Sequence, residues 1–203
     1  MTNFTYSKQE VQDRLESLPN RYRIAFGLSC CERMLPNYAA FEQKVKWGDE
    51  QQLRTALDEL WKYLDAGEME KLTAKRLMDN CEKVAPDADD FSVLLVGPAQ
   101  DACLAICCIL EYVQKLNPER IAQASSYAID TLDGYVSELL DGFPNIARAA
   151  PYNRERDEQI RLHPLMQREL RRQDADLKLL ATHPDLKLLK SQWRAPAKSN
   201  IDL

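Results

Sequence analysis

Residues 98–113 read PAQDACLAICCILEYV, and this stretch decides the fold. It opens with a proline, which suits the first turn of a helix, and its apolar residues then fall on most sides of a helical wheel. Asn117 and Pro118 form a cap and first-turn pair, after which apolar residues recur at helical spacing. Because this connection is short, we predict that residues 98–116 and 118–141 form a central antiparallel helix pair.

The amino-acid composition favours helix along the whole chain. The 28 leucines and 21 alanines outnumber the 7 valines, 8 isoleucines and 6 threonines, and only six glycines are present. Leu and Ala lose little on entering a helix, whereas β-branched residues prefer strands. We therefore predict an all-α fold, a compact multi-helix bundle of roughly seven to nine helices with no significant sheet.

Two places interrupt the helical pattern. Residues 91–96 (FSVLLV) are the one strand-like segment, and since a single strand has no partner we expect a buried extended connection there. Pro36 is expected to end one helix or to begin the next at its first turn.

The chain is expected to form one all-helical domain over residues 1–203. A Pro-bounded connection at 143–151 is a possible subdomain boundary, and residues 151–203 follow it as a charged helical tail with 11 Lys and Arg against 8 Asp and Glu. Some apolar side chains of this tail must pack on the body or on a second copy, from which we expect a homodimer. These side chains are Leu177, Leu180, Leu186, Leu189 and Trp193.

Charge and hydropathy narrow the class of protein. A net charge of −5 and a pI near 5.2 disfavour a nucleic-acid partner, because such proteins carry a basic surface. We find no stretch of ~20 unbroken apolar residues for a membrane span and no apolar signal-peptide core in the first ten residues. We therefore expect a cytoplasmic protein that does not enter a membrane.

The six cysteines are expected to be reduced thiols, as in most cytoplasmic proteins. Cys103 and Cys107 lie one helical turn apart, so both could face a metal or a partner thiol. Free cysteines more often fill helix interfaces, and neither histidine of the chain lies nearby in sequence. We predict packing and no bound metal.

The remaining metal-ligand residue types also favour structural roles. His163 and His183 each precede a proline, and we expect both to be exposed caps. Asp87, Asp89 and Asp90 could bind a hard cation, but the glycine typical of calcium loops is missing. An Asp-rich turn that caps a helix is the favoured interpretation, so we predict no cofactor.

Charged and polar residues that interrupt apolar stretches form the candidate site. Buried charges must be paired or they are strongly destabilising, so an internal ion pair between two helices is the favoured interpretation over the floor of a polar pocket. We expect Arg33 to be mostly buried and to contact Asp90 or Asp101. The candidate polar cluster comprises Glu32, Arg33, Asn37, Tyr38, Asp89, Asp90 and Asp101.

Several of these residues lie in motifs that resemble the YjaG-like bacterial proteins, an uncharacterised family classed as a domain of unknown function. The resemblance implies a compact all-helical bacterial protein and supplies no established activity, cofactor or catalytic residue. The motifs that carry it are Cys31-Glu32-Arg33-Met34, Pro36-Asn37-Tyr38 with Phe41, Ala88-Asp89-Asp90-Phe91, Asp101-Ala102-Cys103 and Ser199-Asn200-Ile201.

Two functions remain open. The chain contains no phosphate-binding glycine loop, dinucleotide fingerprint, nucleophile elbow or paired CxxC. The leading hypothesis is a non-catalytic interaction or regulatory protein that associates with itself or with an unknown protein partner. The alternative is an enzyme or small-ligand binder whose polar pocket contains Glu32, Arg33 and Asp101.

Overall fold

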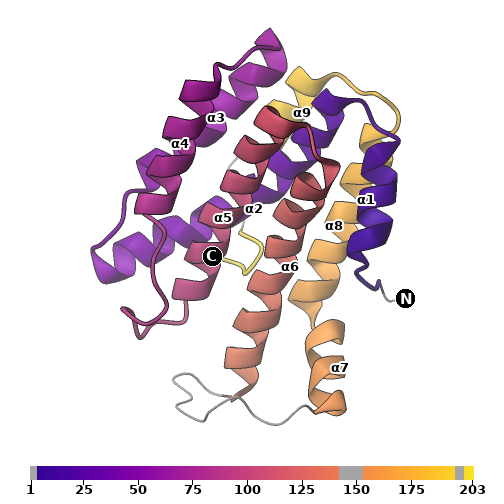
Figure 1. Ribbon diagram of the computed structural model, residues 1–203. Helices are drawn as coiled ribbons and strands as arrows, with labels where there is room; N and C mark the ends of the chain where they lie inside the picture. Colours follow the sequence, from indigo (N-terminus) through magenta and orange to yellow (C-terminus); the bar gives the residue numbers. More distant parts are fainter. Residues whose placement is uncertain (1–3, 142–152, 195–198) are drawn as a thin grey trace.

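The computed structural model describes residues 4–141, 153–194 and 199–203, and within these ranges the protein contains nine helices and no strand (Figure 1). This confirms the predicted all-α bundle. The helices are α1 (Lys8–Glu16), α2 (Asn20–Val45), α3 (Glu50–Ala66), α4 (Lys71–Lys83), α5 (Val96–Lys115), α6 (Pro118–Asp141), α7 (Arg154–Leu162), α8 (Pro164–Leu180) and α9 (Leu186–Trp193).

The centre of the bundle is formed by α5 and α6, whose mutual contacts are the most extensive in the described chain. The two helices run side by side in opposite directions, which confirms the predicted antiparallel pair (Figure 1). Each helix contributes fully buried side chains to the core, such as Ile106 on α5 and Ile121 on α6. Helix α2 packs against both and completes the core.

Helix α2 continues through Pro36 to Val45, so the expected break at this proline is wrong. A proline cannot donate a hydrogen bond to the carbonyl four residues earlier, which here belongs to Glu32. The helix persists because its residues on both sides of Pro36 are buried against neighbouring helices, and that packing outweighs the lost bond.

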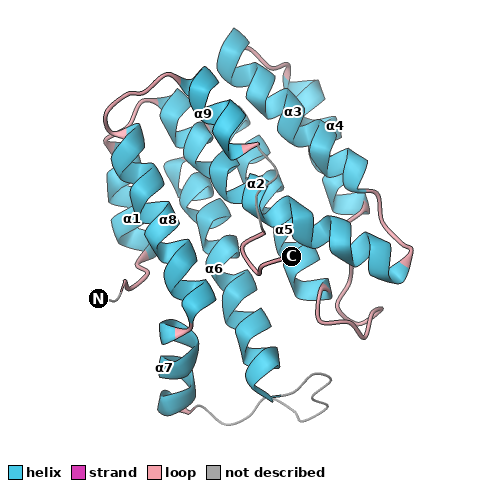
Figure 2. Cartoon of the chain, turned by 180° about the vertical axis from the view of Figure 1, so that it is seen from behind, coloured by secondary structure: helices cyan, strands magenta, loops and turns pink. Residues whose placement is uncertain are grey.

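The α3–α4 hairpin covers one side of this core, and α1, α7 and α8 lie on the other side (Figures 1 and 2). Tail residues Leu177, Leu180, Leu186 and Leu189 are all buried in the core that α2 and α5 also share. The ring of Trp193 lies 6.4 Å from that of Trp61 on α3. These side chains therefore pack on the body of the same chain.

Because these tail side chains are buried within their own chain, they do not support the expected homodimer. Dimerisation itself stays a prediction, as does the single domain. The possible subdomain boundary at 143–151 lies outside the described residues.

Residues 84–95 connect α4 to α5 through turns, and the strand-like segment forms no strand within the described ranges. Val93, Leu94 and Leu95 are half-buried, so the connection packs on the bundle less deeply than expected.

One helix among the described residues, α5, is long and apolar enough to cross a membrane by length and composition alone. Most of its apolar window, 61%, is buried inside the protein, as in the core helix of a bundle. Asp101 and Glu111 interrupt its apolar run, which is why a search for unbroken apolar segments passes over it.

Candidate functional site

Arg33 lies at the centre of an ion-pair network between α2 and α8. Its Nε and Nη2 donate to the two carboxylate oxygens of Glu169, at 3.0 and 2.8 Å, and its Nη1 donates to Asp176 at 3.0 Å. Ser29 donates a further hydrogen bond to Asp176, and Gln173 donates one to Glu169. We call these five residues the Arg33 network.

The Arg33 network is nearly free of solvent. The side chains of Arg33, Glu169 and Asp176 are 8%, 1% and 13% exposed. Burial alone would lower the pKa of Arg33, but Glu169, Cys30 and Asp176 raise it to a higher value than usual, so the guanidinium stays charged. The expected burial and pairing of Arg33 are confirmed, whereas the expected partner, Asp90 or Asp101, is wrong. Helix α8, more than a hundred residues further along the chain, supplies both carboxylates.

Glu32 belongs to a different ion pair because adjacent helical residues point about 100° apart. Its carboxylate accepts two hydrogen bonds from Arg54 on α3, at 2.7 and 2.8 Å, and one from Nε1 of Trp61 at 2.7 Å. The Glu32 side chain is 4% exposed. It connects α2 to α3, on the side away from Glu169, so the structure does not bring Glu32 and Arg33 into one pocket.

Asn37 and Tyr38 hold the ends of other segments against α2. Asn37 donates to the side chain of Asn200 at 2.8 Å, and the backbone N–H of Asn200 donates to the carbonyl of Arg33 at 3.0 Å. The short C-terminal segment consequently lies over α2 (Figure 2). Asn200 lies in one of the resembling motifs, which was the available sequence signal for this contact.

The Tyr38 hydroxyl donates to the carbonyl of Val84 at 2.7 Å and accepts from the N–H of Asp49 at 3.1 Å. Gly48 makes room for it, since a Cβ at this position would lie 2.6 Å from the hydroxyl, and the backbone φ there is +111°. Tyr38 therefore has a structural role at the turn between α2 and α3.

Asp89 and Asp90 are exposed in a turn remote from Arg33. Their N–H groups donate to the side chain and the carbonyl of Asp87. The turn does not cap α5, which begins six residues later at Val96, so that part of the expectation is wrong. Within the described ranges, no three His, Cys, Asp or Glu side chains are grouped closely enough to hold a metal ion.

The two histidines differ in their roles. His163 caps α8 as expected, with its Nδ1 accepting from the N–H of Leu165, but it is half-buried rather than exposed. His183 is not a cap, because Asp185 caps α9. Its ring stacks on Tyr22 at 5.0 Å instead.

All six cysteines are free and buried. Burial raises the pKa of Cys30 to about 12 and that of Cys108 to about 11. A thiol acts as a nucleophile through its thiolate, so these side chains are poor nucleophiles in the folded protein.

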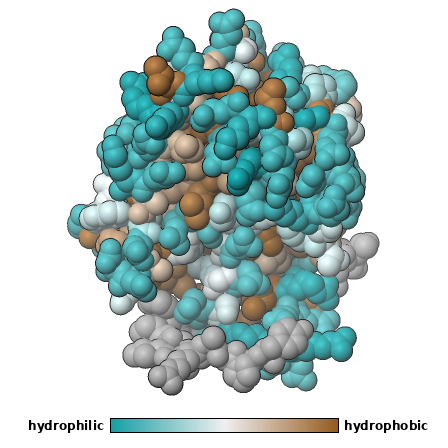
Figure 3. Space-filling model, in the orientation of Figure 1, coloured by the Kyte–Doolittle hydropathy of each residue, from teal (hydrophilic) through white to brown (hydrophobic). Residues whose placement is uncertain are grey.

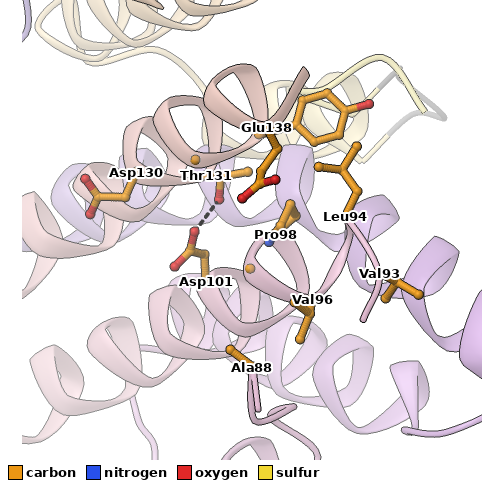
Figure 4. A pocket seen from close by; sticks show the side chains of 12 residues that line it. Ala88, Val93, Leu94, Val96, Pro98, Asp101, Asp130, Thr131 and Glu138 are labelled. Carbon is orange, nitrogen blue, oxygen red and sulfur yellow. Dashed lines mark hydrogen bonds between the residues drawn. The ribbon is translucent and has the colours of Figure 1, made fainter. Parts of the chain in front are cut away.

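Asp101 and Arg33 are members of the candidate polar cluster that each line a pocket of the described structure. Asn37 and Tyr38 have structural roles, Asp89 and Asp90 lie in an exposed turn, and Arg33 lines a pocket of about 130 Å³ together with Ser29 and Asp176. The Asp101 pocket has a volume of about 200 Å³ and lies between the connection before α5 and the facing helices α5 and α6 (Figure 4). Its lining includes Val93, Leu94, Asp101, Thr131, Gly134 and Glu138.

Polar groups converge at one end of the Asp101 pocket. Thr131, itself 1% exposed, donates a hydrogen bond of 2.9 Å to Asp101. The carboxylate of Glu138 is directed toward Thr131, whereas Asp130 points away from this pair (Figure 4). Burial raises the pKa of Asp101 to about 6, and the negative charge of Asp130 adds to the rise while Thr131 opposes it.

Thr131, Gly134 and Glu138 were missed in the sequence, although a signal was present. They recur at three- and four-residue spacing and therefore share one face of α6. This face is distinct from the apolar stripe through Leu132 and Val136, which points into the core.

Comparison with known proteins agrees with the motifs. The family described as "Protein of unknown function (DUF416)" matches residues 10–203. The chain belongs to the DUF416 family. This confirms the resemblance to the YjaG-like proteins, and the family description assigns no activity.

The Salmonella and Shewanella matches extend over nearly the whole length of this DUF416 chain. The "Uncharacterized protein YjaG" of Salmonella typhimurium is 29% identical over 196 residues, 94% of each chain. The Escherichia coli protein of that name is 40% identical over 93 residues, which are 46% of this chain and 47% of that protein. A crystal structure of a DUF416 family protein from Shewanella baltica aligns with a TM-score of 0.78 at 26% identity, covering 95% of this chain and 97% of the other.

Proposed function

We propose that this protein is a non-catalytic interaction or regulatory protein that associates with a second copy of itself. The observation that supports the first part is that the charged side chains of the Arg33 network and of the Glu32 pair are paired with one another. Side chains that a catalytic site would leave available to substrate are here within 3.0 Å of protein partners and nearly free of solvent. The raised pKa values of buried thiols such as Cys30 also support a non-catalytic role.

The surface supports a small self-association interface rather than a broad apolar one. Hydrophobic residues on the face shown in Figure 3 are scattered among hydrophilic ones. Leu188 on α9 is nevertheless 65% exposed and Leu179 on α8 is 39% exposed. Burying one leucine fully contributes about 1.5–3 kcal/mol, so a symmetric contact that used each side chain twice would stabilise a dimer.

Light scattering on the purified chain tests the self-association. We expect a mass of two chains at micromolar concentration and a shift toward one chain for Leu188→Lys. Leu72→Lys is the matched control, since Leu72 is also highly exposed but lies on α4, at 79%. A single-chain mass over the whole concentration range contradicts the self-association.

Localisation and macromolecular partners rest on the sequence. We propose that the protein is cytoplasmic, and the acidic net charge of −5 favours a protein partner over a nucleic acid. Fractionation of the host cell tests the compartment, and a membrane-bound chain would contradict it.

A second candidate function is small-ligand binding, favoured by the Asp101 pocket. The pocket combines apolar walls with a few converging polar groups, the usual lining of a ligand site. Glu32 and Arg33 do not line this pocket, so small-ligand binding here depends on Asp101 and its neighbours. Native mass spectrometry of gently purified protein tests it, because a bound small molecule adds a defined mass to the chain.

A further inference from the structure

We propose that the Asp101 pocket binds a small aliphatic diamine, with one ammonium group at Asp101 and the other at Glu138. This inference names the ligand class of the second candidate function and rests on it, and it does not depend on self-association.

The shape of the pocket is kept open by glycines that the fold itself does not require. Gly97 in the first turn of α5 and Gly134 in the interior of α6 both line the cavity. A Cβ added at either position would meet nothing within 4 Å, and neither residue has a positive φ. Glycine inside a helix is less favourable than alanine. Gly134 is exposed and Gly97 half-buried, so the two glycines widen the side of the pocket that is open to solvent.

Contrast with another helical glycine supports this interpretation. At Gly27 in α2, an added Cβ would lie 3.1 Å from two atoms of Ile109 on α5, so close helix packing explains that glycine. No such contact explains Gly134.

The charge of the lining selects a cation. Asp101, Asp130 and Glu138 are acidic, and none of the described lining residues is Lys, Arg or His. In Figure 4 the carboxylates of Asp101 and Glu138 both point into the region beside Thr131. Opposite charges in such a partly desolvated site attract more strongly than in water.

The apolar walls and the size of the pocket select an organic cation of modest length. Val93, Leu94 and Val96 provide alkyl surface in the lining of the pocket. A cavity of about 150 Å³ holds benzene, so the volume of about 200 Å³ here accommodates a ligand of about six heavy atoms. Hard metal ions prefer six or more oxygen ligands, and no group of three candidate ligand side chains occurs in the described chain.

The position of Asp101 in the empty pocket is electrostatically unfavourable. Its carboxylate is partly removed from water and, among the described residues, accepts a hydrogen bond from Thr131. A ligand ammonium at Asp101 would donate further hydrogen bonds to this carboxylate and offset the cost of its burial.

Isothermal titration calorimetry with 1,4-diaminobutane tests the proposal, with butane-1,4-diol as the neutral analogue of the same length. We expect one diamine per chain and no heat from the diol. Asp101→Asn should weaken diamine binding at least tenfold, and Gly134→Leu, which fills the cavity, should abolish it. The matched control is Asp133→Asn, because Asp133 lies on the same helix but does not line the pocket.

The outcomes separate the ligand class from the pocket. Binding of the diol as tightly as the diamine overturns the diamine and retains ligand binding at this site. Absence of binding by either compound overturns the diamine, and if native mass spectrometry also finds no bound molecule, the second candidate function fails with it. An equal loss in Asp133→Asn and Asp101→Asn shows general charge attraction and overturns the site. Thermal unfolding of each variant confirms that the compared proteins are folded.

Discussion

The Arg33 network and the Asp101 pocket both remove carboxylates from water, but they balance the cost differently. Glu169 faces a guanidinium with two matched hydrogen bonds, and its surroundings are closed. Asp101 has a hydroxyl partner, negative neighbours and an open cavity. A paired buried charge joins two helices, whereas an unpaired buried charge lowers the stability of the folded protein. Such an unfavourable charge is more common at functional sites. The difference directs attention to the pocket as the functional candidate.

Removing Arg33 should have the largest effect on stability. Arg33→Ala leaves Glu169 buried without a counter-charge, so we expect the free energy of unfolding to fall by about 3 kcal/mol or more. Urea unfolding measures this loss. Replacing Arg33 and Glu169 together with apolar residues should recover part of it, and a double-mutant cycle gives the coupling. Unchanged stability in Arg33→Ala would contradict the structural role.

Neutralising Asp101 should have the opposite sign. The pKa of Asp101 is raised from 3.8 to about 6 by burial, so the folded state holds its proton more tightly than the unfolded state. Stability from this group is therefore present below pH about 4 and is lost as pH rises through about 6. Asp101→Asn should be more stable than the parent chain at neutral pH, by about 2 kcal/mol after allowance for partial solvent access.

Urea unfolding over this pH range measures the effect of Asp101→Asn. The gain should disappear below pH about 4, where the parent carboxyl is protonated in both states. Asp130 and Glu138 from α6 are the other acidic groups lining the pocket and remain in both proteins. An Asp101→Asn variant that is less stable than the parent chain at neutral pH would show that its surroundings stabilise the Asp101 carboxylate. This would contradict the expected cost of its burial.

Two glycine substitutions should have smaller effects on the stability of the folded protein. Gly134→Ala should raise stability by about 0.5–1 kcal/mol, because alanine favours the helix and its methyl group enters open space. Gly27→Ala makes the same chemical change against Ile109 and should gain less or lose stability. Thermal unfolding compares the two, and an equal gain would mean that neither glycine is set by its surroundings.

The smallest expected effect concerns Arg14 and Asp174, an ion pair at 3.0 Å whose side chains are 31% and 21% exposed. Arg14→Ala should cost only about 0.2–1 kcal/mol, since solvent and salt screen such pairs. Added salt should reduce this loss, while the loss in Arg33→Ala should change little. A loss as large as that of Arg33→Ala would remove the distinction between surface and buried pairs.

The sequence predicted the local elements well, for reasons visible in single segments. The apolar spacing of residues 98–113 and the Asn117-Pro118 start depend on neighbours along the chain, and α5 and α6 follow them closely. The cap at His163 is equally local. The break expected at Pro36 failed because the cost of one lost backbone bond is local, while the burial that outweighs it comes from distant helices.

The helical class, the central α5–α6 pair and the need of Arg33 for a buried acidic partner can be predicted from the amino-acid sequence. This is because apolar periodicity and the cost of desolvating a charge depend on the residue types alone. The folded protein shows that the partner of Arg33 is Glu169, 136 residues away. It also shows that Asp101 contacts Thr131 in a cavity instead. Several carboxylates could have satisfied the same guanidinium. The choice among them depends on which helix faces pack together, and that is a property of the whole core.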